Sequence, residues 1–125
     1  MIVLDSSAVL ALLFDEPGAD KVREVLPSCI LSAVNYAEVL SRYERDNRDS
    51  RAIADHLSSE VQAIVPFDAA LAYRAALLIG KTRPFGLSLG DRCCLALAID
   101  RKHGILTADR IWLKLGVPIE IKSIR

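Results

Sequence analysis

The sequence predicts a single α/β domain in which a mainly parallel sheet of four to five strands is covered by helices on both faces. Short apolar stretches alternate with longer helical patterns along all 125 residues, and Gly and Pro separate them. No repeat, low-complexity segment or long linker divides the chain. Strands separated by helices are joined by crossovers, so their sheet is mainly parallel and buried on both faces.

The strands are predicted from short apolar stretches that lie next to turn residues. The first of them is apolar up to its last residue, Asp5, and the last is short enough to lie at an edge of the sheet. The predicted strands are Ile2–Asp5, Cys29–Leu31, Ala63–Phe67, Ile105–Thr107 and Ile119–Ile121.

The helices are predicted from the stretches between these strands. Ser32 and Asp68 are suitable N-caps, Pro84-Phe85-Gly86 predicts a loop, and Gly104 is expected to end the last helix. Residues 93–99 of that helix are apolar on every side, which predicts a place in the middle of the protein. The predicted helices are Ser7–Phe14, a short one ending near Pro27, Ser32 to about Asn47, Arg51–Ser59, Asp68 to about Ile79, and Ser88–Lys102.

The composition excludes several classes of protein. Lys plus Arg (16) balance Asp plus Glu (16), so no overall basic field attracts nucleic acid. No apolar stretch approaches the roughly 20 residues of a membrane span, and no export leader follows Met1, which predicts a cytoplasmic protein. The three cysteines and two histidines match no zinc pattern, and the cysteines are expected to fill the core.

Four acidic residues are predicted to lie near one edge of the sheet. Asp5 ends the first strand and Asp109 follows the fourth, while Glu38 lies in the helix after the second strand and Asp91 in the first turn of the apolar helix. In open parallel sheets, ligands bind beyond the carboxyl ends of the strands, near the point where the strand order reverses. These residues are therefore candidates for a functional site, although spacing alone does not bring all four together.

Each acid also has a structural alternative, because helix caps and surface ion pairs are the common uses of carboxylates. Asp5, however, ends a wholly apolar strand and Asp91 opens a wholly apolar helix, so both are anchored close to the core, where unpaired carboxylates repel and need a cation. The alternatives are an Asp5 helix cap, a Ser88–Asp91 capping box, an Asp109 turn cap and a Glu38–Arg42 ion pair.

Magnesium suits a cluster of carboxylates, because it takes hard oxygen ligands and keeps several waters for a substrate phosphate. Manganese can take its place. A divalent ion held in this way activates water and neutralises charge on phosphate, and two ions can stabilise the attacking and leaving oxygens. Phosphodiester hydrolysis is therefore the predicted chemistry.

The sequence resembles the VapC-type PIN-domain toxins of toxin–antitoxin systems in four segments, which appear in the same order. The resemblance spans essentially the whole chain, and the third segment is the most specific. The segments are Met1–Leu10 (MIVLDSSAVL), Leu31–Val39 (LSAVNYAEV), Leu87–Ala98 (LSLGDRCCLALA) and Leu106–Arg110 (LTADR).

The resemblance implies a three-layer α/β/α PIN domain with strand order 3-2-1-4-5 and a magnesium-dependent endoribonuclease activity. It implies that Asp5, Glu38 and Asp91 are the main catalytic and metal-binding acids, with Asp109 as a fourth that contacts the metal directly or through water. The hydroxyls of Ser6 and Thr107 would orient water or neighbouring carboxylates. It further implies a homodimer and a cognate antitoxin whose C-terminal arm covers the active-site groove.

Two sets of residues have more than one interpretation. Basic side chains near the acids are either ordinary solvated charges or contacts for RNA phosphates. Apolar side chains on the helix after Ser32 either belong to the core or dock an antitoxin helix or a second subunit. The basic candidates are Arg42, Arg45, Lys81, Arg83 and Arg92, and the apolar ones are Tyr36, Leu40 and Tyr43.

Three other functions fit less well. Phosphotransfer domains of the receiver or haloacid-dehalogenase type carry a second acid close to the one after the first strand, whereas Asp5 is followed by Ser6 and Ser7. A serine or cysteine hydrolase would need a histidine base, and neither His56 nor His103 lies near a nucleophile motif. A non-catalytic RNA-binding module on the same fold would not need all four acids.

Overall fold

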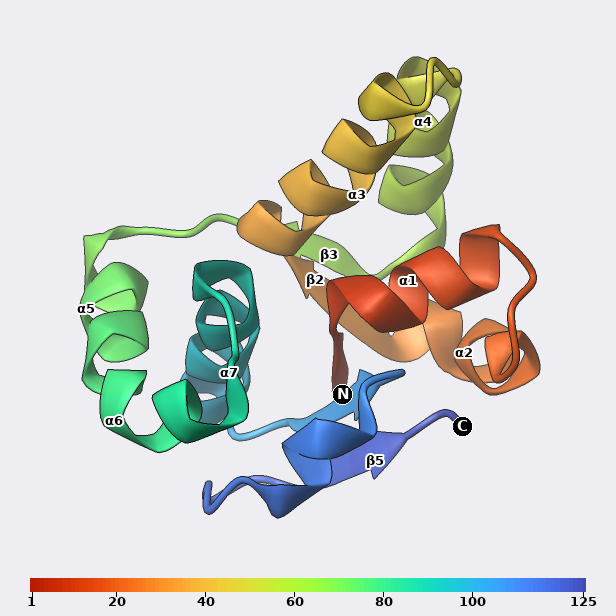
Figure 1. Cartoon of the computed structure of the whole chain (residues 1–125). Helices are drawn as coiled ribbons and strands as arrows, with labels where there is room; N and C mark the ends of the chain where they lie inside the picture. Colours follow the sequence, from red (N-terminus) through yellow and green to blue (C-terminus); the bar gives the residue numbers. More distant parts are fainter.

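Five parallel strands form one sheet in the order β3-β2-β1-β4-β5 in the computed structural model, which describes residues 1–125 (Figure 1). In the register of the sheet, Val3 lies opposite Ile30 on one side and Ile105 on the other. The predicted order is therefore confirmed, and the reversal falls between β1 and β4. The strands are β1 (Ile2–Leu4), β2 (Cys29–Ser32), β3 (Ala63–Val65), β4 (Gly104–Thr107) and β5 (Ile121–Ser123).

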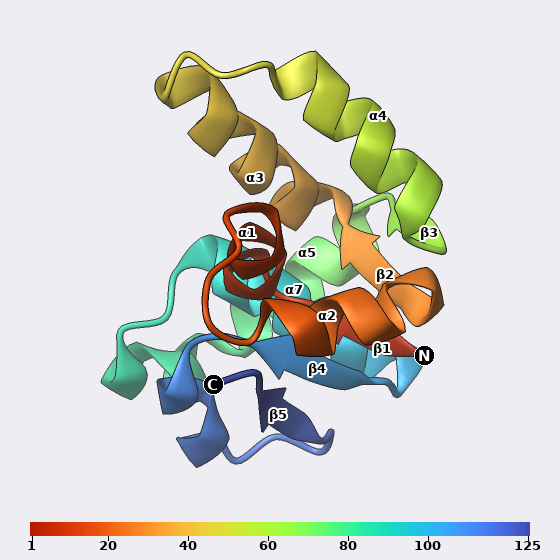
Figure 2. The same ribbon diagram turned by 90° about the vertical axis from the view of Figure 1, so that its right-hand side faces the viewer.

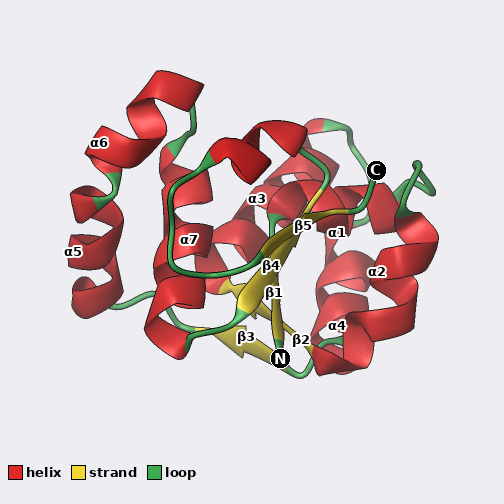
Figure 3. Cartoon of the chain, turned by 90° about the horizontal axis from the view of Figure 1, so that it is seen from below, coloured by secondary structure: helices red, strands yellow, loops and turns green.

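Helices cover both faces of this sheet. Helices α1 to α4 pack on one side and α5 to α7 on the other, so that the strands run between two helical layers (Figures 2 and 3). The helices are α1 (Ser6–Leu13), α2 (Ala19–Val25), α3 (Ala33–Arg45), α4 (Ser50–Glu60), α5 (Ala69–Leu77), α6 (Ile79–Thr82) and α7 (Leu89–Arg101), with 3₁₀ turns η1 (Leu26–Ser28), η2 (Arg83–Phe85) and η3 (Arg110–Lys114).

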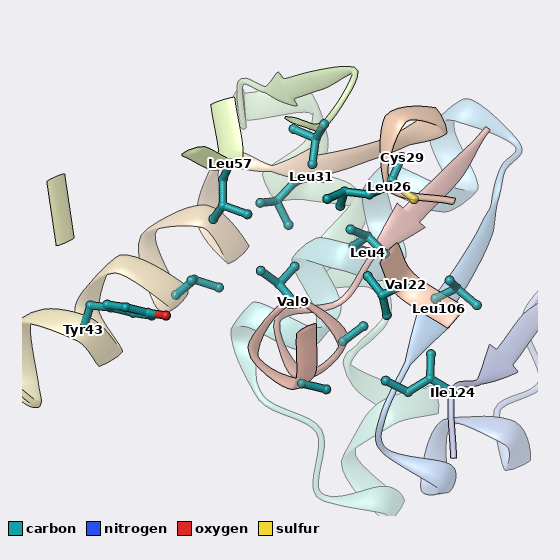
Figure 4. Close-up of a cluster of buried hydrophobic side chains, with 14 residues drawn as sticks. Leu4, Val9, Val22, Leu26, Cys29, Leu31, Tyr43, Leu57, Leu106 and Ile124 are labelled. Atoms are coloured by element: carbon teal, nitrogen blue, oxygen red, sulfur yellow. The ribbon is translucent and has the colours of Figure 1, made fainter. Parts of the chain in front are cut away.

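Alternation along the strands divides the core into two layers. Because successive side chains of a strand point to opposite faces, Val3 packs in one apolar cluster and Leu4 in the other. The cluster beneath α1 to α4 is drawn in Figure 4. It contains Leu4, Val9, Val22, Leu31, Leu57 and Leu106, whereas the opposite cluster contains Val3, Ile30, Leu95, Leu97, Ile105 and Trp112.

The aromatic residues of α3 belong to the core between α1, α3 and α4. Tyr43 is buried and stacks on Phe14, with ring centroids 5.5 Å apart. The Tyr36 hydroxyl donates a hydrogen bond to the Ala54 carbonyl of α4 at 3.0 Å, and its ring, like Leu40, is partly buried. These contacts favour the core interpretation of Tyr36 and Tyr43 over docking, whereas for Leu40 both interpretations stay open.

Local differences from the sequence prediction occur around β4 and β5. Gly104 does not end α7. Instead, Lys102 ends the helix in a left-handed conformation (φ 58°), and Gly104 is the first residue of β4, where an added Cβ would lie 3.1 Å from the Glu120 carbonyl. The fifth strand begins at Ile121, two residues later than predicted.

The segment around Pro84, predicted to be a loop, instead forms the 3₁₀ turn η2 after the short helix α6. The predicted helix caps and the predicted burial of the cysteines are confirmed. Ser32, Asp68 and Ser88 act as N-caps, each accepting a hydrogen bond from a helix amide. All three cysteines are buried and unpaired, as predicted. None of the helices has both the length and the apolar character that a membrane crossing requires.

Candidate active site

The four acids gather at the carboxyl edge of the sheet, where its strand order reverses. Asp5 follows β1 directly, and its amide donates to the Leu106 carbonyl of β4 at 3.1 Å. Asp109 lies two residues beyond β4, Glu38 on α3 and Asp91 in the first turn of α7. The charge of Asp91 raises the pKa of Asp5, while Glu38 and Asp109 raise that of Asp91. Asp91 is thus close enough to each of the other three carboxylates for the charges to repel.

Asp5 is held by hydroxyl groups and does not cap α1. Its side chain is 3% exposed, and one carboxylate oxygen accepts hydrogen bonds from Ser7 and, at 2.9 Å, from Thr107. Burial raises the pKa of Asp5 from 3.8 to about 6; the two hydroxyls lower it, and Asp91 raises it further. Although Asp5 occupies the N-cap position, it makes no capping hydrogen bond.

Ser7 and Thr107 also fix the loop that carries Asp109. The Ser7 hydroxyl accepts a hydrogen bond from the Ala108 amide at 2.9 Å, and the Thr107 hydroxyl accepts one from the Asp109 amide at 3.0 Å. Thr107 therefore links the Asp5 carboxylate to the Asp109 loop, and its role in orienting a metal ligand stays a prediction. Ser7 was not singled out from the sequence; the only local signal was its place two residues after Asp5.

Glu38 is exposed but restrained through one oxygen. Its Oε1 accepts hydrogen bonds from Ser6 and, at 2.8 Å, from the Asn35 amide. The predicted alternative, an ion pair with Arg42, is wrong, because Arg42 pairs with Asp46 at 2.9 Å. Ser6 is thus hydrogen-bonded to the Glu38 carboxylate, and its role in orienting a metal ligand stays a prediction.

Asn35 is a second residue that the sequence did not reveal. It is completely buried, and its Nδ2 donates to Glu38 and to the Gly90 carbonyl at 3.1 Å. Its Oδ1 has no hydrogen-bond partner. A buried orphan acceptor of this kind costs about 1–3 kcal/mol. The sequence signal would have been its spacing, since a residue three positions before Glu38 on a helix lies on the same face.

Gly90 leaves room for the Glu38 carboxylate. A Cβ added to Gly90 would lie 2.2 Å from Glu38 Oε2 and 2.6 Å from its Cδ. Any other residue at this position would therefore displace Glu38. Gly90 lies in the first turn of α7, which gives no local reason for a glycine.

The structural alternatives for Asp91 and Asp109 are both present. Asp91 forms the predicted capping box with Ser88: the Ser88 amide donates to Asp91 Oδ2 at 2.8 Å, and the Asp91 amide donates to the Ser88 hydroxyl at 3.2 Å. Burial raises the pKa of Asp91, the Ser88 hydrogen bonds lower it, and Glu38 and Asp109 raise it. Asp109 Oδ1 caps η3 by accepting from the Ile111 amide at 3.0 Å.

One pattern is shared by all four acids. Each accepts its side-chain hydrogen bonds through a single carboxylate oxygen, so the second oxygen has no protein donor, and none of the four forms an ion pair. The bonded oxygens are Asp5 Oδ2, Glu38 Oε1, Asp91 Oδ2 and Asp109 Oδ1.

This donor set fits a hard divalent cation. Uncompensated carboxylates with free oxygens are the ligands that magnesium and manganese prefer. In the conformation observed, no group of three or more His, Cys, Asp or Glu side chains is arranged to hold a metal ion. Magnesium usually keeps several waters and is held directly by only one or two carboxylates, so the remaining acids would contact it through water.

Two grooves border the acids and share Arg42. One, of about 480 Å³, is lined by Ser6, Glu38, Arg42 and Arg45. The other, of about 380 Å³, is lined by Arg42, Asp109 and Arg125, among others. The structure thus brings two of the predicted RNA-binding arginines beside the acids, and it adds Arg125, which sequence reasoning missed.

The other three predicted RNA-binding residues line neither groove. Lys81 donates to the Gly116 carbonyl at 3.0 Å, and Arg92 donates to the Ala75 carbonyl of α5 at 3.1 Å. Arg83 is exposed on η2. Their contact with RNA stays a prediction.

The histidines lie away from the acids. His103 directly precedes β4, so it lies at the amino edge of the sheet, where it lines a cavity of about 680 Å³. His56 is exposed on α4 and lines a groove with Leu12 and Leu26. Neither lining contains any of the four acids. Although the 680 Å³ cavity is the larger, we place the chemistry at the carboxyl edge because the repelling carboxylates lie there.

Comparisons with known proteins agree with this geometry. A family model described as "PIN domain" matches residues 2–117. No curated protein matches the sequence. Among solved structures, a toxin–antitoxin complex from Klebsiella pneumoniae has a TM-score of 0.77 at 18% identity, covering 100% of this chain and 98% of that chain.

Two further structures have the same fold. DNA-bound VapBC from Salmonella typhimurium has a TM-score of 0.75 at 14% identity, covering 99% of this chain and 98% of that chain. VapC20 of Mycobacterium tuberculosis, described as a Sarcin-Ricin loop cleaving toxin, has a TM-score of 0.70 at 18% identity, covering 88% of this chain and 91% of that chain. At such identities the likeness is one of fold.

Proposed function

This chain belongs to the PIN-domain family, and from that premise we propose that it is a magnesium-dependent endoribonuclease, the toxin of a toxin–antitoxin pair. The observation that carries the proposal is the set of four carboxylates in which Asp91 repels the other three, each with one oxygen free of protein hydrogen bonds and none with a basic partner. Such an arrangement is unfavourable without a cation.

The acids Asp5, Glu38, Asp91 and Asp109 would hold the metal through their free oxygens. When bound, a divalent cation supplies an activated water and neutralises charge on a phosphate. The protein itself supplies the hydrogen bonds that hold the metal-binding carboxylates in position. Hydrogen bonds from Ser7 and Thr107 keep the Asp5 carboxylate in place, and hydrogen bonds from Ser6 and Asn35 do the same for Glu38.

The substrate would be RNA, bound along the two grooves that share Arg42. Guanidinium groups bind phosphates through paired hydrogen bonds. Arg42 and Arg45 lie in the same groove as Glu38, and Arg42 also lies in the groove of Asp109. A phosphate between these side chains would be near the acids that hold the cation.

The proposed partners are a cognate antitoxin and a second copy of the chain, and the proposed place of action is the cytoplasm. Support for an antitoxin comes from the structurally similar proteins, several of which were solved as toxin–antitoxin complexes. Light scattering of the purified protein, alone and with the antitoxin, measures both associations.

The proposal is tested with purified protein and fluorescently labelled RNA. We expect cleavage in magnesium, none in EDTA, and none by an Asp5→Asn variant that is folded. Asp55→Asn is the matched control, because Asp55 is exposed on α4 (68%); it should cut at the wild-type rate. Undiminished cutting in EDTA, or by Asp5→Asn, would remove the carboxylates from the reaction.

The toxin role is tested in cells. Expression of the chain alone should stop growth of a host, and Asp5→Ala should relieve the arrest at equal protein level. Continued arrest by soluble Asp5→Ala protein would mean that binding, and not cleavage, is the harmful act.

A further inference from the structure

We infer that Asn35 is a positioning residue for Glu38 and that Gly90 is a glycine because it must admit the same carboxylate. The inference rests on the proposed function, since it explains how Glu38 is fixed for a cation and a phosphate. Its basis is a chain of hydrogen bonds that connects α1, α3 and α7 through one buried amide.

The orientation of the Asn35 amide follows from its neighbours. Nδ2 lies 2.8 Å from Glu38 Oε1 and 3.1 Å from the Gly90 carbonyl oxygen, and both atoms accept hydrogen bonds. A flipped amide would bring Oδ1 against two acceptors, so only the NH₂ group can face them. Asn35 therefore uses both of its donors, one on the carboxylate and one on the helix that carries Asp91.

The other half of the amide is left without a partner. Asn35 is completely buried, and Oδ1 accepts no hydrogen bond. Because buried polar groups are normally paired, an orphan acceptor needs an explanation. An apolar side chain of similar size would fill the same space without this penalty. The two donated hydrogen bonds are thus what the asparagine contributes.

Gly90 supplies the matching space on α7. An added Cβ would lie 2.2 Å from Glu38 Oε2 and 2.7 Å from Oε1. Glu38 would then have to leave the position in which Ser6 and Asn35 hold it. Gly80 on α6 offers a comparison, because a Cβ added there meets nothing within 4 Å.

Glu38 is therefore restrained from two sides, by donors on Oε1 and by the limited space beside Gly90. Partners that orient a metal ligand typically change metal affinity by about 10- to 100-fold when they are removed. We expect an effect of that size from Asn35→Ala and from Gly90→Ala. Two variants on different helices keep the inference testable if one of them does not fold.

The experiment measures manganese and magnesium affinity of the 125-residue chain by calorimetry, with thermal unfolding in EDTA measured in parallel. Asn35→Ala and Gly90→Ala should bind the metal about 10- to 100-fold more weakly than wild type. The matched controls are Glu44→Ala, an exposed residue on the same helix as Asn35 that lines neither groove, and Gly80→Ala. Both should bind within about threefold of wild type.

A double variant separates positioning from a merely structural role. If Asn35 acts through Glu38, Asn35→Ala should weaken binding further by less than about threefold once Glu38 is already Gln. If Asn35→Ala weakens metal binding about 10- to 100-fold further in the Glu38→Gln background, Asn35 acts on the fold and not through Glu38, and the inference is overturned.

Failure of this inference is distinguishable from failure of the proposed function. A wild-type chain that binds neither metal would remove the proposed function and the inference with it. A wild-type chain that binds metal, together with Asn35→Ala and Gly90→Ala variants of unchanged affinity, would overturn the inference alone.

Discussion

Asp5 should destabilise the metal-free protein at neutral pH, so its replacement by Asn should stabilise it. Burial raises the pKa of this carboxyl from 3.8 to about 6. In the unfolded chain the group ionises near its ordinary value, whereas in the folded chain it keeps its proton longer. The free energy of unfolding therefore falls as the pH rises between about 4 and 6.

The size of the effect follows from the same two pKa values. At about 1.4 kcal/mol for each pH unit, the difference between 3.8 and about 6 corresponds to about 3 kcal/mol at pH 7. Asn at this position keeps an oxygen that can accept the Ser7 and Thr107 hydrogen bonds. In EDTA at pH 7.5, Asp5→Asn should thus be more stable by up to about 3 kcal/mol, or roughly 10 °C in melting temperature.

The assay is urea unfolding in EDTA at pH 4.5 and 7.5, followed by fluorescence of Trp112, the single, buried tryptophan. Wild type should lose stability between the two pH values, and Asp5→Asn should lose less. The exposed Asp55→Asn variant should stay within about 0.5 kcal/mol of wild type. A loss of more than about 1 kcal/mol in Asp5→Asn at pH 7.5 would refute the reasoning, because Asp5 would then serve mainly to hold the fold.

Three further predictions concern the metal, the reaction products and the RNA. Magnesium at 100 times its dissociation constant should stabilise wild type by about 2.7 kcal/mol. Asp91→Ala should lose much of this stabilisation and, because its capping box is broken, should also be less stable than wild type in EDTA by about 0.5–2 kcal/mol. Stabilisation of Asp91→Ala by magnesium as large as that of wild type, measured by scanning calorimetry, would contradict this prediction. Cleaved RNA should carry 5′-phosphate and 3′-hydroxyl ends, and a His56→Ala, His103→Ala double variant should still cut; cyclic phosphates in end analysis would show that the 2′-hydroxyl takes part. Arg45→Ala in the inactive Asp5→Asn background should weaken RNA binding in filter assays and reduce its salt dependence by about one phosphate contact. Arg83 lines neither groove, so Arg83→Ala should reduce the salt dependence less.

Most of the fold was predictable because local patterns determine it. β1, β2 and β4 are short and mainly apolar strands, and residues 93–99 of α7 are apolar on every side, so their burial was evident from the sequence. Gly104 was misassigned because a glycine near a helix end usually marks the cap. Here Lys102 takes the left-handed position, and Gly104 lies close to the Glu120 carbonyl, which is a contact between segments that no local pattern reveals.

The predicted acids were found at the expected edge of the sheet, but their supporting residues were not predictable from local patterns. Asn35 meets Gly90 across 55 positions of the chain, and Ser7 meets Thr107 across 100. Such contacts depend on how α1, α3, α7 and β4 come together, so only the assembled sheet shows them. The resemblance to VapC-type toxins supplied Ser6 and Thr107, whose positions are part of the matched segments.

The sequence left each acid with a choice between a structural role and a role in a site, and the structure indicates that this choice was too strict. Asp91 and Asp109 each cap the start of a helical segment through one oxygen and keep the other oxygen free. A cap fixes the backbone and the side chain together, so it also fixes where the free oxygen lies. The capping bonds therefore serve the site as well as the helix.

The same division explains how repelling carboxylates can stay close together before a cation binds. Each acid gives one oxygen to donors within the fold, and those hydrogen bonds lower the pKa of Asp5 and Asp91 against the opposing effect of burial. These hydrogen bonds offset part of the cost of the buried charges but leave the pKa of both groups raised. The ionised carboxylates therefore remain unfavourable in the empty protein, and a divalent cation would stabilise them. Full neutralisation by a lysine or arginine would stabilise the empty protein and would also make a cation superfluous. The absence of an ion pair at all four acids is thus the feature that keeps the site able to bind one.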